Sequence, residues 1–404
     1  MPGVSSHRPL PLAMAACILL VSTSCAVSRP SSELEKAGPS PTEALQETPT
    51  SLLQPTVTER PTETQPPAAT IVPPTETVPP ALVGPQFPGD IDPLSGLPVS
   101  DPSLLDRRPV AIKVSNFPRS LRPQSGLSIA DLVFEYYTEE GMSRFLAVYL
   151  GQDVSKAGPV RSARYVDSEL VTMYQAVLGF VGADPMVWAQ VVGTLGSRAI
   201  SESPSTCPAL CRAGKGDVNS VFADTAAFTT LSKSQGRHDL GGMTFQHEPP
   251  SGGPSGSKVQ VRFSWGTRAE WRYDETLGAY QRWSESEQGD NIVMVPLADR
   301  NTGEQIQAFN VAVLYAWYSR LSGNEKYNVE FLYRKRGRVQ LFRDGMVYEG
   351  FWVAPSPTSP LQFVDASGAP LPFHPGNTWL EVVGEYSAAK QINPGEWEVD
   401  FALP

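Results

Sequence analysis

Two arginines stand close together in the stretch GPVRSARYVDSEL, residues 158–170, and their side chains could bind an anion. Arg161 and Arg164 are three residues apart, a spacing that places both on one face if the segment is helical. A guanidinium group presents a planar fork of N–H donors that matches a carboxylate or a phosphate. The start of a helix adds unpaired backbone N–H groups, which also favour anions. We therefore predict an anion-binding corner, which Arg122 and Arg144 are further candidates to line.

The same arginines could instead hold the fold together. The acidic side chains of Asp131, Glu135 and Asp167 are available as partners, and buried ion pairs with them would use up both guanidinium groups. No donor would then remain for a ligand. The sequence leaves both interpretations open, with Asp131 and Glu135 as the predicted acidic partners.

Acidic residues also raise the question of catalysis. Glu135, Glu139 and Glu140 follow one another along a strand-like segment and its turn, and two carboxylates that flank a cleft can hydrolyse a glycosidic bond. An acidic hairpin is more often solvated surface or a partner for cations. No G-x-S-x-G motif is present, and the S-x-x-K spacing of Ser255 and Lys258 falls in a segment rich in Gly and Pro. The residues favour binding over catalysis.

The cysteines of the folded part predict a disulfide rather than a metal site. Cys207 and Cys211 lie four residues apart, and such a pair in an exported protein forms a disulfide by default. A zinc site needs four ligands, and no second Cys or His pair stands at ligand spacing. No phosphate-binding loop, dinucleotide fingerprint or calcium loop appears. We therefore expect no metal and no cofactor.

The N-terminus has the layout of an export signal. Residues 1–25 begin with weakly basic residues, continue with an apolar run from Leu10 to Val21, and end in small residues. The segment VSTSC resembles a bacterial lipobox, whose cysteine becomes lipid-modified, although Ser22 stands where such motifs usually carry Leu. We expect lipidation at Cys25. The alternative is an ordinary cleaved signal that happens to contain a cysteine.

A tether follows the signal over residues 26–89. It is rich in Pro, Thr, Ser and Glu, and residues 26–84 contain no aromatic side chain. Such a chain buries too little apolar surface to offset the entropy lost on ordering. We predict a disordered linker that holds the folded body away from a membrane.

The sequence after the tether predicts two domains with different patterns of secondary structure. Residues 90–248 alternate strand-like and helix-like segments, which indicates a mixed α/β or α+β domain. Its expected elements are strands over 110–116, 132–140 and 144–151, the last two forming a hairpin, and a helix over 160–176. Residues 249–257 are rich in Pro, Gly and Ser, and we predict that they form a linker. Residues 258–404 show short alternating segments between turns, typical of a β-rich domain.

Longer motifs resemble a known family. RPVAIKVSN, RPQSGLSIADLVFE, EGMSRFLAVY and GPVRSAR are similar to the signature region of the YerB-like bacterial lipoproteins. WRYDETLGAYQRW and the stretch from VQLFRDGMVYEGFWV onward resemble the second part of the same family. Together the likeness covers nearly all of residues 93–386. It implies a membrane-tethered, extracytoplasmic protein built of two parts of unknown function, and it implies no particular enzymatic activity.

These observations lead to an expected function. The net charge is −10 with no basic block, which argues against nucleic acid as a partner. We expect a protein of the bacterial cell envelope, anchored on the extracytoplasmic face, that binds another envelope protein or a peptidoglycan fragment. A cell-wall hydrolase that uses Asp or Glu is one alternative. A structural envelope protein without a ligand is the other.

Overall fold

The computed structural model describes residues 82–83, 86–214, 217, 219–289, 291–321 and 327–404. The signal segment with Cys25 and most of the tether lie outside these residues. Within the described part, no helix has both the length and the apolar character needed to cross a bilayer.

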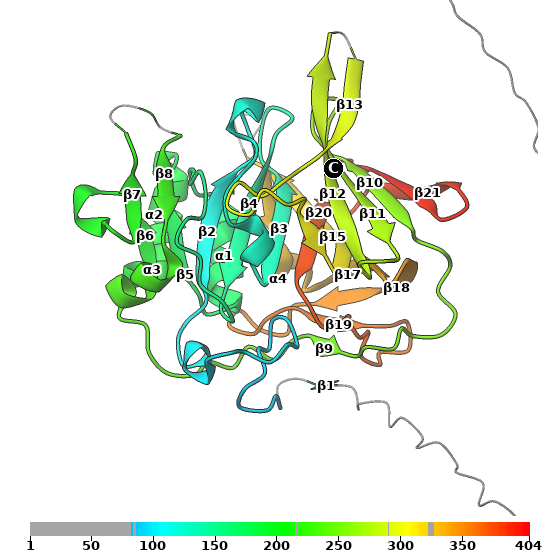
Figure 1. The fold of residues 1–404 in the computed structure, drawn as a ribbon, viewed down its shortest axis with the longest axis horizontal. Coiled ribbons are helices and arrows are strands. Elements are labelled where there is room, and N and C mark those ends of the chain that lie inside the picture. Colours follow the sequence, from blue (N-terminus) through cyan, green and yellow to red (C-terminus); the bar gives the residue numbers. More distant parts are fainter. Residues whose placement is uncertain (1–81, 84–85, 215–216, 218, 290, 322–326) are drawn as a thin grey trace, which may run out of the picture. The chain divides into compact units, whose positions relative to one another are not determined.

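One mixed sheet of 11 strands runs through the folded part (Figure 1). Its strands are β2 (Val110–Ser115), β3 (Leu132–Tyr137), β4 (Ser143–Tyr149), β5 (Val177–Phe180), β6 (Ala199–Ser201), β15 (Asn310–Arg320), β16 (Tyr327–Glu330), β17 (Arg336–Arg343), β18 (Met346–Val353), β19 (Gln362–Val364) and β20 (Thr378–Gly384). The hydrogen-bonded order is β19-β18-β17-β15-β20-β3-β4-β2-β5-β6, and β16 pairs with β15.

The two segments of the chain share this sheet. Strand β20, drawn in red, lies between β15 and the cyan β3, and it pairs with both in parallel (Figure 1). The segment predicted as a linker is itself fastened: the Val347 N–H donates to the Pro254 carbonyl at 2.9 Å, and the Gly256 N–H donates to the Gly345 carbonyl at 2.8 Å. The predicted bounds 90–248, 249–257 and 258–404 remain a prediction, but strands from both sides of the predicted linker share the large sheet.

A second sheet of seven strands packs over the first. Its strands are β10 (Lys258–Arg262), β11 (Arg268–Asp274), β12 (Ala279–Gln288), β13 (Asn291–Pro296), β14 (Gln307–Ala308), β21 (Ala388–Asn393) and β22 (Glu396–Asp400). The order is β13-β12-β11-β10-β22-β21, with β14 paired to β12. The side chains of Trp271 and Tyr280 from this sheet are buried with Val313 and Trp379 from the large sheet, and they form the core between the two layers.

Helices are few. They are α1 (Tyr165–Met173), α2 (Pro185–Leu195), α3 (Thr225–Ser232) and the single turn α4 (Phe331–Arg334), with short 3-10 turns at Pro102–Leu105, Arg119–Leu121, Leu127–Ile129, Gly196–Arg198 and Pro204–Thr206. Two short pairs complete the described elements, β1 (Leu82–Val83) with β9 (Thr244–Phe245) and β7 (Leu210–Arg212) with β8 (Val221–Ala223). The prediction of a mixed α/β domain followed by a β-rich domain is therefore met only in part, since the described residues are rich in strands throughout.

Both faces of the large sheet are covered, which explains why its central strands are buried at most positions. In β3, Leu132, Phe134 and Tyr136 enter the core that α1 and α2 cover. Val133 points to the opposite face, into the core shared with α3 and the second sheet. This alternation is the period of two that a strand imposes on its side chains.

A buried ionic network joins the two sheets. Arg282 on β12 donates to the Glu135 carboxylate of β3 and to the Glu381 carboxylate of β20, each at 2.8 Å, and all three side chains are fully buried. The Arg282 guanidinium also lies 5.1 Å from the Trp271 ring centre and 5.2 Å from that of Trp379. Cation–π attraction therefore adds to the two ion pairs.

The network contains more carboxylates than cations, and this shifts a pKa. Burial and the neighbouring Glu135 charge raise the pKa of Glu381 to about 8, against the opposing effect of Arg282. The Trp271 indole N–H donates to Glu381 Oε1 at 2.8 Å. Below about pH 8, Glu381 therefore holds a proton.

The predicted helix over 160–176 begins later than expected. Residues 160–164 are extended because they bond to neighbouring strand ends: the Arg161 N–H donates to the Lys113 carbonyl at 2.9 Å, and the Val181 N–H donates to the Arg161 carbonyl at 3.0 Å. Helix α1 starts at Tyr165, with Arg164 as its N-cap. The expectation that Arg161 and Arg164 share a helix face is wrong. The predicted β3–β4 hairpin is present.

Candidate functional site

The predicted arginine corner lies at the carboxyl ends of parallel strands. Strands β2 and β5 are parallel neighbours, and the extended segment before α1 crosses their ends. This edge is where α/β sheets commonly bind ligands. Arg161 and Arg164 come from that segment, and Arg144 comes from the start of β4 beside it.

Arg164 and Arg144 are held together by one carboxylate that the sequence analysis did not assign to them. Glu139 accepts from Arg164 Nε at 2.8 Å and from its Nη2, and it also accepts from Arg144 Nη2 at 3.4 Å. Arg164 Nη1 donates to the Ala163 carbonyl at 2.9 Å, and Arg144 Nη1 donates to the Ser162 carbonyl at 2.8 Å. Arg164 therefore stabilises the fold and has little capacity left for a ligand.

Beneath these arginines lies a fully buried polar triad. Asp167 Oδ1 accepts from Lys113 Nζ at 3.2 Å and from the Tyr136 hydroxyl, while its Oδ2 accepts the Arg164 N–H at 2.6 Å and so caps α1. Burial lowers the pKa of Lys113 to about 7, against the raising effect of Asp167. The triad fixes the start of α1 and does not reach solvent.

Arg161 is the member of the corner that keeps unused donors. Within the described part of the chain its guanidinium forms no hydrogen bond or ion pair, and its Nε is buried without a partner. Burial lowers the pKa of Arg161, and the nearby Asp217 opposes that effect. The prediction of two open guanidinium groups is thus reduced to a single one.

The other predicted residues have different neighbours. Arg122 donates to the Asn116 side chain at 2.8 Å and to the Glu285 carboxylate at 2.8 Å, which ties β2 to the second sheet. Glu135 pairs with Arg282 and also accepts from the Ser143 hydroxyl at 2.6 Å. Asp131 bonds at the opposite end of β3. Neither Asp131 nor Glu135 pairs with Arg161 or Arg164, so the prediction of these ion pairs is wrong.

Asp131 instead belongs to an acid pair. Its Oδ2 accepts the backbone N–H of Leu150 at 2.6 Å and that of Gly151 at 3.2 Å. The Asp92 and Asp131 carboxyl groups share a hydrogen bond. Burial raises the pKa of both, and the charge of Asp92 raises that of Asp131 further. When two carboxylates share a site, the pKa of one of them is raised strongly, because their like charges repel.

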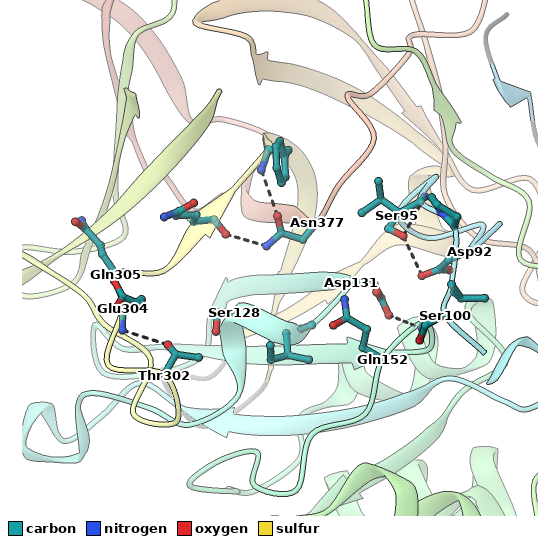
Figure 2. Close-up of a pocket in the computed structure, with 18 residues that line it drawn as sticks. Asp92, Ser95, Ser100, Ser128, Asp131, Gln152, Thr302, Glu304, Gln305 and Asn377 are labelled. Atoms are coloured by element: carbon teal, nitrogen blue, oxygen red, sulfur yellow. Dashed lines mark hydrogen bonds between the residues drawn. The ribbon is translucent and has the colours of Figure 1, made fainter. Parts of the chain in front are cut away.

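This acid pair forms part of the wall of a cavity of about 540 Å³. The cavity lies where β3, β15 and β20 begin, at the sheet edge opposite the arginine corner. Figure 2 shows Thr302, Glu304 and Gln305 along one side and Asp92, Ser95 and Ser100 along the other, with Ser128, Asp131 and Gln152 between them and Asn377 above. Its volume falls in the range of small-molecule sites, roughly 300 to 1,000 Å³.

The lining of the cavity is mostly neutral and hydrogen-bonding. Some of its groups are already used: Asn377 Nδ2 donates to the Gln307 carbonyl at 2.8 Å, and Gln305 Nε2 donates to the Arg282 carbonyl at 2.7 Å. Among the described residues, the side chains of Gln152 and Gln307 have no hydrogen-bond partner. Phe309 and Ile129 add apolar surface. Such a lining suits a polar ligand with hydroxyl or amide groups.

The carboxyl groups of Asp92 and Asp131 do not have the spacing expected for glycoside hydrolysis. Asp92 and Asp131 are in direct contact, whereas the two carboxyls of a glycosidase stand at least about 5 Å apart. Glu135 and Glu381 are sealed in the core. Among the described residues, no cluster of His, Cys, Asp and Glu could hold a metal ion.

The predicted disulfide between Cys207 and Cys211 is present. It closes a loop just before and within β7. The sequence interpretation of the pair as a local loop staple is confirmed.

Comparisons with known proteins match both segments. The model for the N-terminal domain of the DUF3048 proteins of unknown function matches residues 94–237, and the model for their C-terminal domain matches residues 259–380. The putative lipoprotein YerB of Bacillus subtilis (strain 168) is 27% identical over 326 residues, which cover 75% of this chain and 89% of YerB. The crystal structure of YerB from Bacillus subtilis superposes with a TM-score of 0.60 at 26% identity, covering 72% of this chain and 96% of that chain. The resemblance inferred from the motifs is confirmed.

The two arginines of the corner should differ in what they contribute to stability. We expect Arg164→Ala to lower the free energy of unfolding by about 1–3 kcal/mol, because it leaves the partly buried Glu139 with fewer donors. Arg161→Ala should change it by less than about 0.5 kcal/mol, since no partner loses a bond. Urea denaturation of the two variants measures both values, and equal losses would contradict the assignment of Arg161 as an open group.

Proposed function

Because this chain belongs to the DUF3048 family, we propose that it is a lipid-anchored protein of the bacterial cell envelope that binds a polar cell-wall fragment. The relative YerB bears the name of a putative lipoprotein, which supports anchoring in the envelope. The lipobox-like segment with Cys25 and the tether-like composition that follows are consistent with this. Binding would then take place outside the membrane, at the distance that the tether allows.

The cavity at the start of β3, β15 and β20 is the observation that carries the binding proposal. Besides their carboxylates, peptidoglycan fragments present sugar hydroxyls, acetamido groups and peptide amides, which pair with neutral donors and acceptors. Gln152 and Gln307 offer both on the cavity wall, and their side chains have no partner within the described residues. Apolar side chains beside them can cover the faces of sugar rings.

The acid pair gives this site a defined electrostatic character. Because burial raises the pKa of both Asp92 and Asp131, the pair becomes fully charged only at a higher pH than two exposed carboxylates would. A neutral or weakly charged ligand is therefore not repelled. Backbone N–H groups at Leu94, Leu150 and Gly151 satisfy the carboxyl oxygens, so the pair braces the cavity wall.

Binding can be measured with a purified peptidoglycan disaccharide–tetrapeptide. The protein would be the chain from residue 26 onward, exported without the lipid signal, and the method isothermal titration calorimetry. We expect the double variant Gln152→Ala with Gln307→Ala to bind about tenfold or more weakly, because a hydrogen bond is lost at each position. Gln391→Ala, at an exposed position on β21, is the matched control and should bind as the wild type does.

Failure of the wild type to bind the fragment would remove the cell-wall proposal. Equal affinity of the double variant and the wild type would remove the cavity as the site. The remaining expected partner, another envelope protein, could then be sought by cross-linking in cells.

Lipid attachment is tested separately. We expect growth with a radioactive fatty acid to label the wild-type protein and to leave Cys25→Ala unlabelled, because the thiol of that residue is the expected attachment point. Cys211→Ala serves as the control and should retain the label, since the disulfide belongs to the folded body. Labelling that persists without Cys25 would contradict the anchor.

A further inference from the structure

A second cavity is lined by cationic side chains that form no ion pair within the described residues. It measures about 400 Å³ and lies where β2 and β5 begin, beside the carboxyl ends of α2 and α3. Three cationic side chains line it, those of Arg108, Arg198 and Lys233, together with the side chains of Ser197 and Ser232. No acidic residue lines this cavity. It shares no residue with the cavity of the proposed function or with the arginine corner.

The two arginines of this cavity are anchored by main-chain oxygens. Arg108 Nη1 donates to the Gln175 carbonyl at 2.8 Å, and Arg198 Nη1 donates to the carbonyls of Val171 and Ala176 at 3.2 and 3.1 Å. The carbonyls at the end of α1 favour a cation there. Each guanidinium therefore uses one nitrogen for the fold and keeps Nε and Nη2, and neither arginine forms an ion pair within the described residues.

Lys233 adds a third charge from an exposed position. It follows the last turn of α3 in a left-handed conformation with φ 50°, and its ammonium group has no partner in the part of the chain that the structure describes. The charges of Arg108 and Arg198 also affect His238: burial lowers the pKa of its imidazole, and these two charges lower it further. Three uncompensated cations around one cavity are unusual in a chain of net charge −10.

The chemistry of this set matches a tetrahedral oxyanion. Two guanidinium forks, an ammonium group and serine hydroxyls can together donate to the three terminal oxygens of a phosphate monoester. A single carboxylate would satisfy only one fork. We propose that the cavity of Arg108, Arg198 and Lys233 binds the terminal phosphate of a phosphate monoester. Its volume leaves room for a small group attached to that phosphate.

Calorimetry with inorganic phosphate tests the site on the chain from residue 26 onward, at fixed ionic strength. We expect the wild type to bind and Lys233→Asn to bind about tenfold or more weakly, since a charge-assisted hydrogen bond is lost. Asn tolerates the left-handed conformation, so the backbone is preserved. The matched control is Lys335→Asn, which removes a lysine from the same conformation, φ 61°, after α4. It should bind phosphate as the wild type does.

Two results would overturn the proposal. One is the absence of phosphate binding by the wild type at millimolar concentration. The other is an equal loss in both lysine variants, which would reflect net charge rather than a site.

Two further probes identify the source of the phosphate. Vesicles of phosphatidylcholine with and without phosphatidic acid present a lipid monoester, and glycerol 3-phosphate presents a soluble one. If binding of one probe becomes weaker in Lys233→Asn but not in Lys335→Asn, the result supports the site. The probe that behaves in this way identifies whether the phosphate comes from a lipid or from a soluble molecule. If both variants bind a probe as tightly as the wild type does, the cavity is not the site that binds this probe.

Discussion

The structure depends on one arginine that is buried between two glutamates. Arg282 reaches from the second sheet to Glu135 and Glu381 on adjacent strands of the large sheet, and none of these side chains is exposed. Removing three ionisable groups from water is costly, and the two ion pairs of Arg282 together with a neutral Glu381 reduce that cost, while Arg282 Nε and Glu381 Oε2 form no hydrogen bond. The two indole rings beside Arg282 occupy the remaining space around the guanidinium. The position of one sheet on the other is thereby set by a polar contact within an apolar core.

This network also connects the core to the proposed binding site. The Arg282 N–H donates to the Ile306 carbonyl at 2.8 Å, and its carbonyl accepts the Leu297 N–H at 3.0 Å. The Gln305 side chain, which lines the cavity, donates to the same carbonyl. The loop that forms one wall of the cavity is therefore held by the strand that carries the buried charge. Because Glu135 comes from the first family segment and Arg282 from the second, each segment completes the core of the other.

Local patterns in the sequence predict local structure here and little beyond it. The β3–β4 hairpin and the short disulfide loop follow from alternation, turn residues and cysteine spacing, all of which act over a few residues. The insertion of β20 beside β3 joins residues far apart in the chain, and alternation does not say which strands are neighbours. The sequence gives a misleading signal at Glu135 and Lys113. A charged residue inside a strand suggests a solvated face, but both faces of this sheet are covered and both side chains are buried. The identity of Glu139 as the partner of Arg164 required the fold of the loop before α1.

The most direct test of the buried network is the pH dependence of stability. The pKa of Glu381 is raised from about 4.5 in the unfolded chain to about 8 in the fold, so its stabilising contribution is complete below pH 4.5 and is lost as the pH rises towards 8. Glu381→Gln cannot titrate, and its free energy of unfolding should fall less over this range than that of the wild type, by an amount on the order of a few kcal/mol. Glu385→Gln, at the partly exposed carboxylate that pairs with Arg334, is the control and should follow the wild type. Parallel curves for the wild type and Glu381→Gln would contradict a protonated glutamate beside Arg282.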